Sequence, residues 1–158
     1  MRMVPSRFFV TKGAALNDVS TLNAFDDALI AGGIGEQNLV PVSSVIPVGA
    51  VRTEKTVLPM GAITHCVLAR RDSAGGERIS AGIAYAMRKD GMGGYVAEAD
   101  GACGTDELIG KLKDRLDAIA GARGVALARH EYVVSELSVP EGTNGCCIAS
   151  LVFTEYGK

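Results

Sequence analysis

The stretch TDELIGKLKDRLDAIA, residues 105–120, carries the clearest helical pattern in the sequence. Its apolar side chains recur at helical spacing and form one stripe, made of Leu108, Ile109, Leu112, Leu116 and Ile119. Thr105 is predicted to cap this helix, and Asp106 and Glu107 suit its positive end. A helix with a single apolar stripe packs one face against the rest of the fold, so other elements are expected beneath it.

Segments typical of β-strands lie on both sides of this helix. They are residues 7–11, 37–42, 60–70, 78–87 and 93–99 before it, and residues 125–139 and 146–156 after it. Gly75-Gly76 is predicted to turn the chain between two of these strands, and residues 12–20 are interpreted as a polar connection. Pro41 inside the segment 37–42 predicts an edge strand or a bend.

A second helix is predicted early in the chain, because the apolar residues between 24 and 29 recur at helical spacing. Asn23 is the expected N-cap, with Asp26 completing a variant of the capping box, and Gly32-Gly33 ends the element. The order of elements predicts one α+β domain with sheets inside and helices outside. Neither a repeat nor a domain linker is visible in the sequence.

Composition excludes several classes of function. The chain has 158 residues, of which 47% are hydrophobic, and a formal net charge of −2, so no basic surface for nucleic acid is expected. The apolar run Phe8-Phe9-Val10 is too short for a secretory signal or a membrane helix, which predicts a cytoplasmic protein without membrane contact. The four cysteines are interpreted as small buried hydrophobes, and with two histidines no metal site is predicted.

None of the common catalytic signatures is present. The sequence lacks a G-x-S-x-G elbow, a P-loop and an H-E-x-x-H motif. The glycine-rich patch at residues 32–35 follows a helix rather than opening one, which argues against a dinucleotide site. Ser43-Ser44 follows the predicted strand 37–42, and taken alone such a pair is more typical of a strand end or turn than of a reactive site.

Several short motifs in a fixed order change this interpretation. They are LNAFD (22–26), GIG (33–35), Asn38-Leu39, Ser43-Ser44 with Ile46-Pro47, LPMGA (58–62) and Glu98. The set resembles the pyruvoyl-dependent arginine decarboxylases, a family related to the pyruvoyl histidine decarboxylases. The resemblance extends from about Arg7 to the C-terminus and is densest between Leu22 and Ala62. It implies a four-layer αββα sandwich and assembly as a trimer or a dimer of trimers, with the active site between neighbouring subunits.

The resemblance also implies a proenzyme that cleaves itself between Ser43 and Ser44, giving chains 1–43 and 44–158. An attack of the Ser44 hydroxyl on the Ser43 carbonyl is intramolecular, so positioning replaces much of the entropic barrier. Elimination and loss of ammonia then convert Ser44 into a covalent pyruvoyl group, and no external cofactor is needed. This group forms a Schiff base with the substrate amine and accepts electrons as carbon dioxide leaves, turning arginine into agmatine.

Three further residues match the family's functional positions. Glu98 matches the proton donor, for which partial burial would raise the pKa usefully, although a solvent-facing glutamate is the more common case. Asp26 matches the contact to the substrate guanidinium, although a helix start also favours a carboxylate there. Asn38 matches the residue that assists self-processing, but it could equally cap the turn after Gly35.

Asn38 poses a geometric difficulty. Six residues of straight strand would separate it from Ser44 by about 20 Å. Either Pro41 bends the segment back towards Ser44, or Asn38 acts across a subunit boundary. Two rival functions also remain: a pyruvoyl decarboxylase for another amino acid such as histidine, and a non-enzymatic oligomeric scaffold with the same fold.

Overall fold

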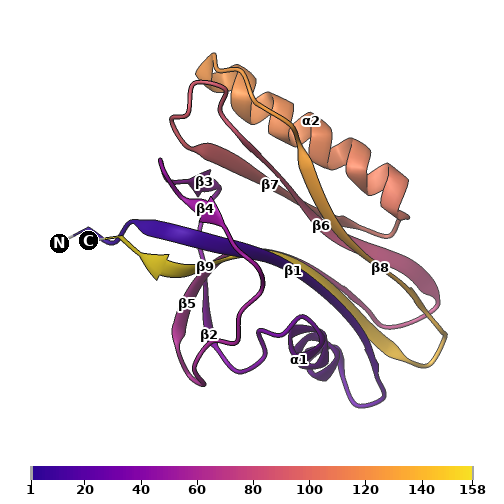
Figure 1. The fold of residues 1–158 in the computed structure, drawn as a ribbon. Helices are drawn as coiled ribbons and strands as arrows, with labels where there is room; N and C mark the ends of the chain where they lie inside the picture. The colour runs from indigo at the N-terminus through magenta and orange to yellow at the C-terminus, as the bar shows by residue number, and fades with distance from the viewer. Residues whose placement is uncertain (1, 158) are drawn as a thin grey trace.

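The strands form two sheets that stack face to face (Figure 1). The computed structural model describes residues 2–157 and, within them, places strands in the orders β2-β5-β9-β1-β4 and β3-β7-β6-β8. The five-stranded sheet contains β1 (Pro5–Asn17), β2 (Asn38–Pro41), β4 (Val51–Arg52), β5 (Ile63–Ser73) and β9 (Asn144–Tyr156). The four-stranded sheet contains β3 (Val45–Ile46), β6 (Glu77–Met87), β7 (Gly94–Gly101) and β8 (Glu131–Val139).

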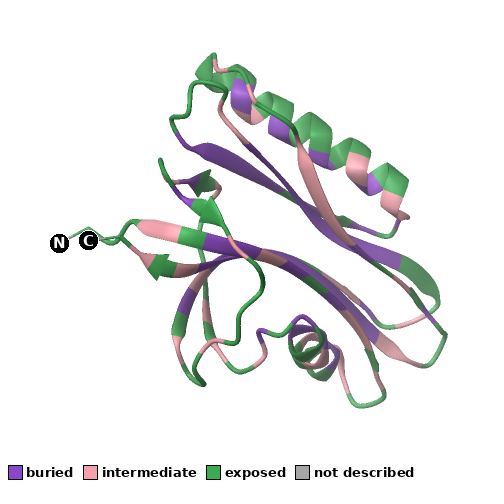
Figure 2. Ribbon diagram, viewed as in Figure 1, coloured by how far each residue is buried: buried purple, intermediate pink, exposed green. Residues whose placement is uncertain are grey.

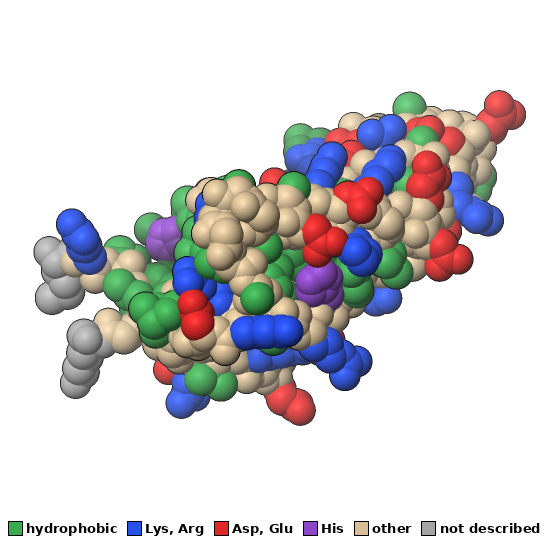
Figure 3. Space-filling view, turned by 90° about the horizontal axis from the view of Figure 1, so that it is seen from above, with side chains coloured by type: hydrophobic (Ala, Val, Ile, Leu, Met, Phe, Trp, Pro, Cys, Tyr) green, Lys and Arg blue, Asp and Glu red, His purple; other side chains and the backbone are tan. Residues whose placement is uncertain are grey.

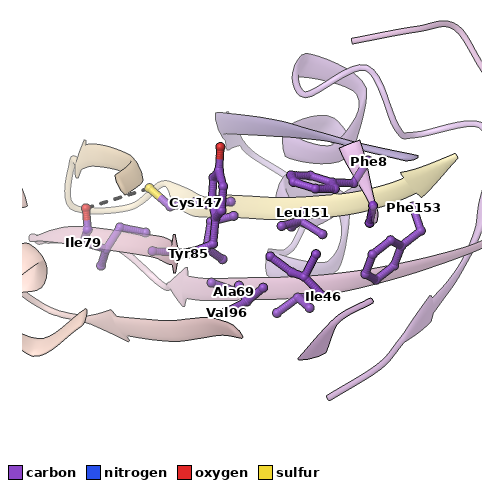
Figure 4. Packing of buried hydrophobic residues seen from close by; sticks show 14 of the residues in the cluster. Phe8, Ile46, Ala69, Ile79, Tyr85, Val96, Cys147, Leu151 and Phe153 are labelled. Atoms are coloured by element: carbon purple, nitrogen blue, oxygen red, sulfur yellow. Dashed lines mark hydrogen bonds between the residues drawn. The ribbon is translucent and has the colours of Figure 1, made fainter. Parts of the chain in front are cut away.

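The main core lies between the two sheets. Period-two alternation along β1 sends Phe8 into this core and Phe9 to the opposite face, and both are fully buried. Phe8 meets the ring of Tyr85 from the other sheet edge to face, with ring centres 5.6 Å apart. Figure 4 shows the side chains of Leu151, Ile46 and Val96 directed into the same space.

Each helix covers the outer face of one sheet. The helix α1 (Thr21–Ala31) packs on the five-stranded sheet through Ala24, Ala28 and Leu29. The helix α2 (Thr105–Arg123) packs on the four-stranded sheet, and the purple stripe along it in Figure 2 faces that sheet. The prediction of one α+β domain is therefore confirmed. Within residues 2–157, neither helix has the length and apolar character required to cross a membrane.

The apolar stripe predicted for α2 is confirmed, but its residues are fully buried at the centre and less buried at the two sides. Leu108, Leu112 and Leu116 are fully buried, whereas Ile109 and Ile119 are half-buried at the sides of the stripe. Gly82 of β6 lies directly below, where a Cβ atom would come within 3.0–3.1 Å of the Leu112 and Leu108 methyl groups. The missing side chain therefore lets the helix approach the sheet closely.

Both predicted helix starts are wrong in detail. The N-cap of α1 is Ser20, whose Oγ accepts a hydrogen bond of 3.0 Å from the Asn23 backbone N–H. Asn23 therefore lies inside the first turn, and Asp26 lies one turn further on rather than in a capping box. In α2 the cap is Gly104 and Thr105 is already helical. The predicted end of α1 is confirmed, since Gly32 is its C-cap.

Two strand boundaries also differ from the predictions. β1 continues through the stretch interpreted as a polar connection and ends at Asn17, because residues 5–17 pair with β9 along their length. Lys12 in this stretch is exposed and Asn17 is half-buried, and both belong to the strand rather than to a loop. β8 begins at Glu131, six residues later than predicted, since only an isolated bridge joins Leu127 to Arg88. The turn at Gly75-Gly76 is confirmed, with positive φ at both glycines.

Candidate active site

The short segment between β2 and β3 crosses from one sheet to the other. At its start, the Val42 backbone N–H donates to the Cys66 carbonyl of β5, at 2.8 Å, in the five-stranded sheet. At its end, the Ser44 carbonyl accepts from the Val96 N–H of β7, at 2.9 Å, in the four-stranded sheet. The peptide bond between Ser43 and Ser44 therefore lies in the gap between two fixed points.

The chain after Ser44 is held firmly. Ile46 is 1% exposed and inserts into the core between the sheets (Figure 4). Opposite it, Gly93 has a φ of +88°, and a Cβ atom there would lie 2.5 Å from the Ile46 carbonyl oxygen. A glycine is thus required for the close approach of these two segments. The position of Ser44 is fixed by backbone hydrogen bonding on one side and by core packing on the other.

A cavity of about 410 Å³ opens beside this segment. Its polar wall contains Ser43, Ser44 and Glu98, which the sequence analysis singled out separately and the fold brings together. The rest of the lining comes from β5, β7 and one flank of α2, namely Val67, Val96, Ala97, Arg115, Ala118 and Ile119. The cavity therefore curves around the edge of β7, from the space between the sheets to the surface of α2.

Glu98 is placed by strand alternation. Val96 points into the core between the sheets, whereas Ala97 and Ala99 pack beneath α2, so Glu98 opens towards the gap between the sheets. The residue is exposed as a whole, but partial burial of its carboxyl group raises the pKa above the ordinary value. The positive charge of Arg115 opposes that rise in pKa and the negative charge of Asp100 adds to it.

Arg115 is a charged lining residue that no sequence motif marks. It lies on α2, and its Nη1 donates a hydrogen bond of 2.6 Å to the backbone carbonyl of Glu98. Seventeen residues separate the two in the sequence, so local spacing gives no hint of the contact. The available signal was weak: Arg115 precedes Ile119 by one helical turn, at the flank of the apolar stripe.

Asn38 does not reach this cavity within its own chain. Its backbone N–H bonds to the Ala62 carbonyl at 2.9 Å, and its side-chain Nδ2 donates to the Gly61 carbonyl at 2.9 Å. From there β2 pairs with β5 in continuous parallel register up to Pro41. Because the N–H groups of residues 38 and 42 point to β5, Pro41 faces the open edge and its missing N–H leaves the pairing intact. Pro41 therefore does not bend the segment back.

Asp26 also lies away from the cavity. It is exposed on α1, on the far side of the five-stranded sheet from Glu98. Since the first turn of α1 contains no acidic residue, Asp26 does not serve the positive end of that helix. The neighbouring Asp27 has a local structural contact, because its Oδ2 accepts a hydrogen bond from Asn17 at 2.8 Å. No such partner is found for the Asp26 carboxylate among residues 2–157.

The polar groups available at the cavity are two hydroxyls, one carboxyl and the guanidinium of Arg115. Across the described chain, no three His, Cys, Asp or Glu side chains come close enough together to hold a metal ion. The cysteines are buried, and burial raises the pKa of the Cys66 thiol to about 11, which keeps it protonated near neutrality. A covalent group formed from Ser44 fits the site, because residue 44 lies in the cavity wall with its carbonyl fixed by Val96.

Comparison with known proteins identifies a family and several relatives of this chain. The family profile "Pyruvoyl-dependent arginine decarboxylase (PvlArgDC)" matches residues 7–158. A pyruvoyl-dependent arginine decarboxylase of Thermococcus kodakarensis is 34% identical over 155 residues, covering 96% of this chain and 97% of the relative. That of Methanocaldococcus jannaschii is 35% identical over 131 residues, covering 82% and 78%.

One solved structure has a similar fold. A pyruvoyl-dependent histidine decarboxylase at pH 8 superposes with a TM-score of 0.52 and 16% identity, over 65% of this chain and 56% of that chain. At this level of identity the likeness concerns the fold. The family profile covers nearly the whole chain, and the two arginine decarboxylases match it over more than two thirds of their length. The resemblance inferred from the sequence motifs is thus confirmed, and the chain belongs to the pyruvoyl-dependent arginine decarboxylase family.

Proposed function

We propose that this chain is a proenzyme that cleaves itself between Ser43 and Ser44 and then decarboxylates arginine to agmatine. The observation that carries the proposal is the single cavity of about 410 Å³ whose wall contains both serines and Glu98. Membership of the family supports the covalent pyruvoyl cofactor and the substrate class. The products of cleavage are residues 1–43 and residues 44–158.

In the first stage the Ser44 hydroxyl attacks the carbonyl carbon of Ser43. The C–N bond breaks as an ester forms, and the freed nitrogen takes up the proton. Elimination then removes the Cα proton of residue 44 and breaks the bond between its Cβ and oxygen, which releases Ser43 as a carboxylate and leaves dehydroalanine at residue 44. Reaction with water removes ammonia and leaves a pyruvoyl group at residue 44. Fixing the segment at Val42 and Ser44 favours the attack, because little motion remains between hydroxyl and carbonyl.

In the second stage the pyruvoyl carbonyl supplies the electron-accepting chemistry that decarboxylation requires. Glu98 carries a proton and donates it to the substrate carbon from which carbon dioxide has left. A raised pKa suits this role, since the carboxyl must still be protonated near neutrality. The apolar walls formed by Val67, Val96 and Ala97 favour the conversion of a charged carboxylate into neutral carbon dioxide.

Asp26 and Asn38 are proposed to serve the cavity of a neighbouring subunit. Both are exposed on the α1 and β2 side of the chain, and neither lines the cavity beside its own Ser44. In this arrangement Asp26 receives the guanidinium through two parallel hydrogen bonds, and Asn38 hydrogen-bonds the scissile carbonyl as negative charge develops. The homo-oligomer that this requires is a trimer or a dimer of trimers of four-layer αββα subunits.

Exposed apolar side chains support assembly with other copies. Green side chains gather in Figure 3 at the end of the molecule that carries the two termini. Met3, Val42 and Val45 share a pocket of about 230 Å³ there with Tyr156. Val45, Val48 and Val51 are each more than half exposed, although they flank the segment that contains the scissile bond. Such clusters mark interaction surfaces in soluble proteins.

Mass spectrometry of the purified protein tests the proposal directly. Two fragments, residues 1–43 and 44–158, are expected, and the larger should start with a carbonyl that borohydride reduces. The same preparation should release carbon dioxide from arginine in preference to other amino acids. A full-length chain after prolonged incubation would instead support the non-enzymatic scaffold, and a preference for histidine would support the rival substrate.

Replacing Asp26 by asparagine tests the guanidinium contact. The expected result is a rise in KM for arginine of about ten- to a hundredfold, because one charge-assisted pair contributes about 1.5–3 kcal/mol. Asp27→Asn is the matched control: it removes an adjacent carboxylate that contacts Asn17 and should leave KM unchanged. Steady-state kinetics on both variants measures KM for arginine, and an equal rise in KM at the two positions would refute a specific role for Asp26.

A further inference from the structure

Arg115 holds an unusual position beside the proposed proton donor. Its Nη1 donates to the Glu98 backbone carbonyl at 2.6 Å, a bond that joins α2 to β7 at the rim of the cavity. Among the nine lining residues, all within the described chain, Arg115 alone carries a positive charge. Building on the proposed function, we propose that Arg115 is a positioning residue of the active site, which fixes the backbone of Glu98 and places a cation next to its carboxyl group.

The open edge of β7 explains why Glu98 needs such a contact. β3 pairs with β7 at Gly94 and Tyr95, and the Ser44 carbonyl then bonds to Val96. Beyond that point, no strand among residues 2–157 continues the pairing on this side. Backbone groups two positions apart on a strand point to the same edge, so the carbonyl of residue 98 faces the same side of β7 as the Val96 backbone N–H. The guanidinium therefore replaces the missing strand as hydrogen-bond partner and restrains the backbone from which Glu98 projects.

The charges around Glu98 come from three elements. Asp100 lies on the same face of β7, and its Oδ2 is 3.2 Å from Nη1 of Arg71 on β5, so its effect on Glu98 is partly compensated. Cys66 of β5 lies on the opposite face of the five-stranded sheet, under α1, and its thiol is uncharged. α2 contributes Arg115 and, near Gly101, the ammonium group of Lys111. The residue opposite Glu98 on β6 is the uncharged Ile83.

This balance suits a group that must both hold and release a proton. Burial alone would keep Glu98 protonated but would make it a weak acid. The charge of Arg115 favours the ionised carboxylate and so limits the rise in pKa. Arg115 therefore adjusts the acidity of the donor while its hydrogen bond fixes the donor's place.

The first experiment measures Glu98 itself in Ser44→Ala protein, so that it does not depend on cleavage or catalysis. Glutamate carboxyl groups labelled with 13C are titrated by NMR, and the Glu98 signal is assigned by its loss in Glu98→Gln. Arg115→Met should move the Glu98 midpoint to higher pH, because a stabilising positive charge is removed. Arg115→Gln, a second variant without charge, should do the same, while Arg115→Lys should keep the parent midpoint.

Lys113→Met is the matched control, since it removes a cation from the same helix that pairs with Asp117 instead. An unchanged midpoint in Arg115→Met and Arg115→Gln would overturn the inference, as would an equal shift in Lys113→Met. These outcomes are independent of the proposed function, which fails separately if the unmodified chain neither cleaves itself nor decarboxylates arginine.

The second experiment uses the cleaved enzyme. Arg115→Met should lower kcat about tenfold with little change in KM for arginine, because the donor is less well placed. The pH at which kcat falls should also move upward, since Glu98 stays protonated to higher pH. A loss of kcat without any change in the pH at which kcat falls would indicate a merely structural role and would overturn the assignment.

Discussion

The Ser44→Ala variant is expected to remain a single polypeptide and to have no decarboxylase activity. Alanine lacks the hydroxyl that attacks the Ser43 carbonyl, and it cannot be converted into a pyruvoyl group. Since the covalent group provides the electron-accepting chemistry, the loss should amount to the whole enzymatic acceleration, about a millionfold or more. A denaturing gel tests whether the chain stays uncleaved, and intact mass tests whether a pyruvoyl group is absent. Carbon dioxide release from arginine measures the loss of activity.

Ser43→Ala is the matched control for this variant. It keeps the Ser44 hydroxyl and still presents a carbonyl at residue 43, so cleavage should occur at the same bond. Its fragments should differ from the parent ones in the mass of the smaller chain alone. Cleavage of Ser44→Ala, or activity in its uncleaved form, would contradict the assignment of Ser44 as the precursor.

The Glu98→Gln variant is expected to lose about a hundred- to ten-thousandfold in kcat, the usual contribution of a positioned general acid. Glutamine has nearly the same shape and keeps the strand geometry, but it cannot donate the required proton. Rates should be expressed per borohydride-reducible carbonyl, so that any change in self-processing is separated from the change in decarboxylation. Glu107→Gln, an exposed residue in the first turn of α2, should match the parent.

The pH profile gives the same variant a second signature. A proton donor works in its protonated form, so parent activity should fall as pH rises through the pKa of Glu98, which burial raises. In Glu98→Gln that alkaline limb should be absent, because residue 98 no longer titrates. A limb that persists unchanged in the variant would assign the ionisation, and with it the proton donor, to another group.

Much of the fold follows from local sequence patterns. The buried leucines of α2, the glycine turn at residues 75–76 and the end of α1 are set by periodicity and backbone preference, which a sequence displays directly. The start of α1 was misplaced because Ser20 and Asn23 are both good capping residues, and side-chain type alone does not choose between them. β1 was predicted too short because its second half is kept in the sheet by pairing with β9.

Sequence motifs indicated five site residues, of which the fold places three at one cavity and leaves Asp26 and Asn38 elsewhere on the chain. The three are the two serines of the scissile bond and Glu98. Their proximity depends on a chain segment that leaves one sheet and joins the other, and no local pattern encodes such a crossing. The contact of Arg115 with Glu98 arises from the packing of α2 on β7, so it too becomes visible in three dimensions alone.

The crossing segment also determines what self-cleavage would do to the molecule. Residues 1–43 include β1, which is inserted between β9 and β4, so the shorter polypeptide would stay interwoven with the longer one after the cut. The two new ends would remain attached to different sheets, one through Val42 on β5 and the other through residue 44 on β7. Maturation would thus divide the cavity wall at one bond, and the newly made cofactor would form at a chain end that stays anchored to the four-stranded sheet.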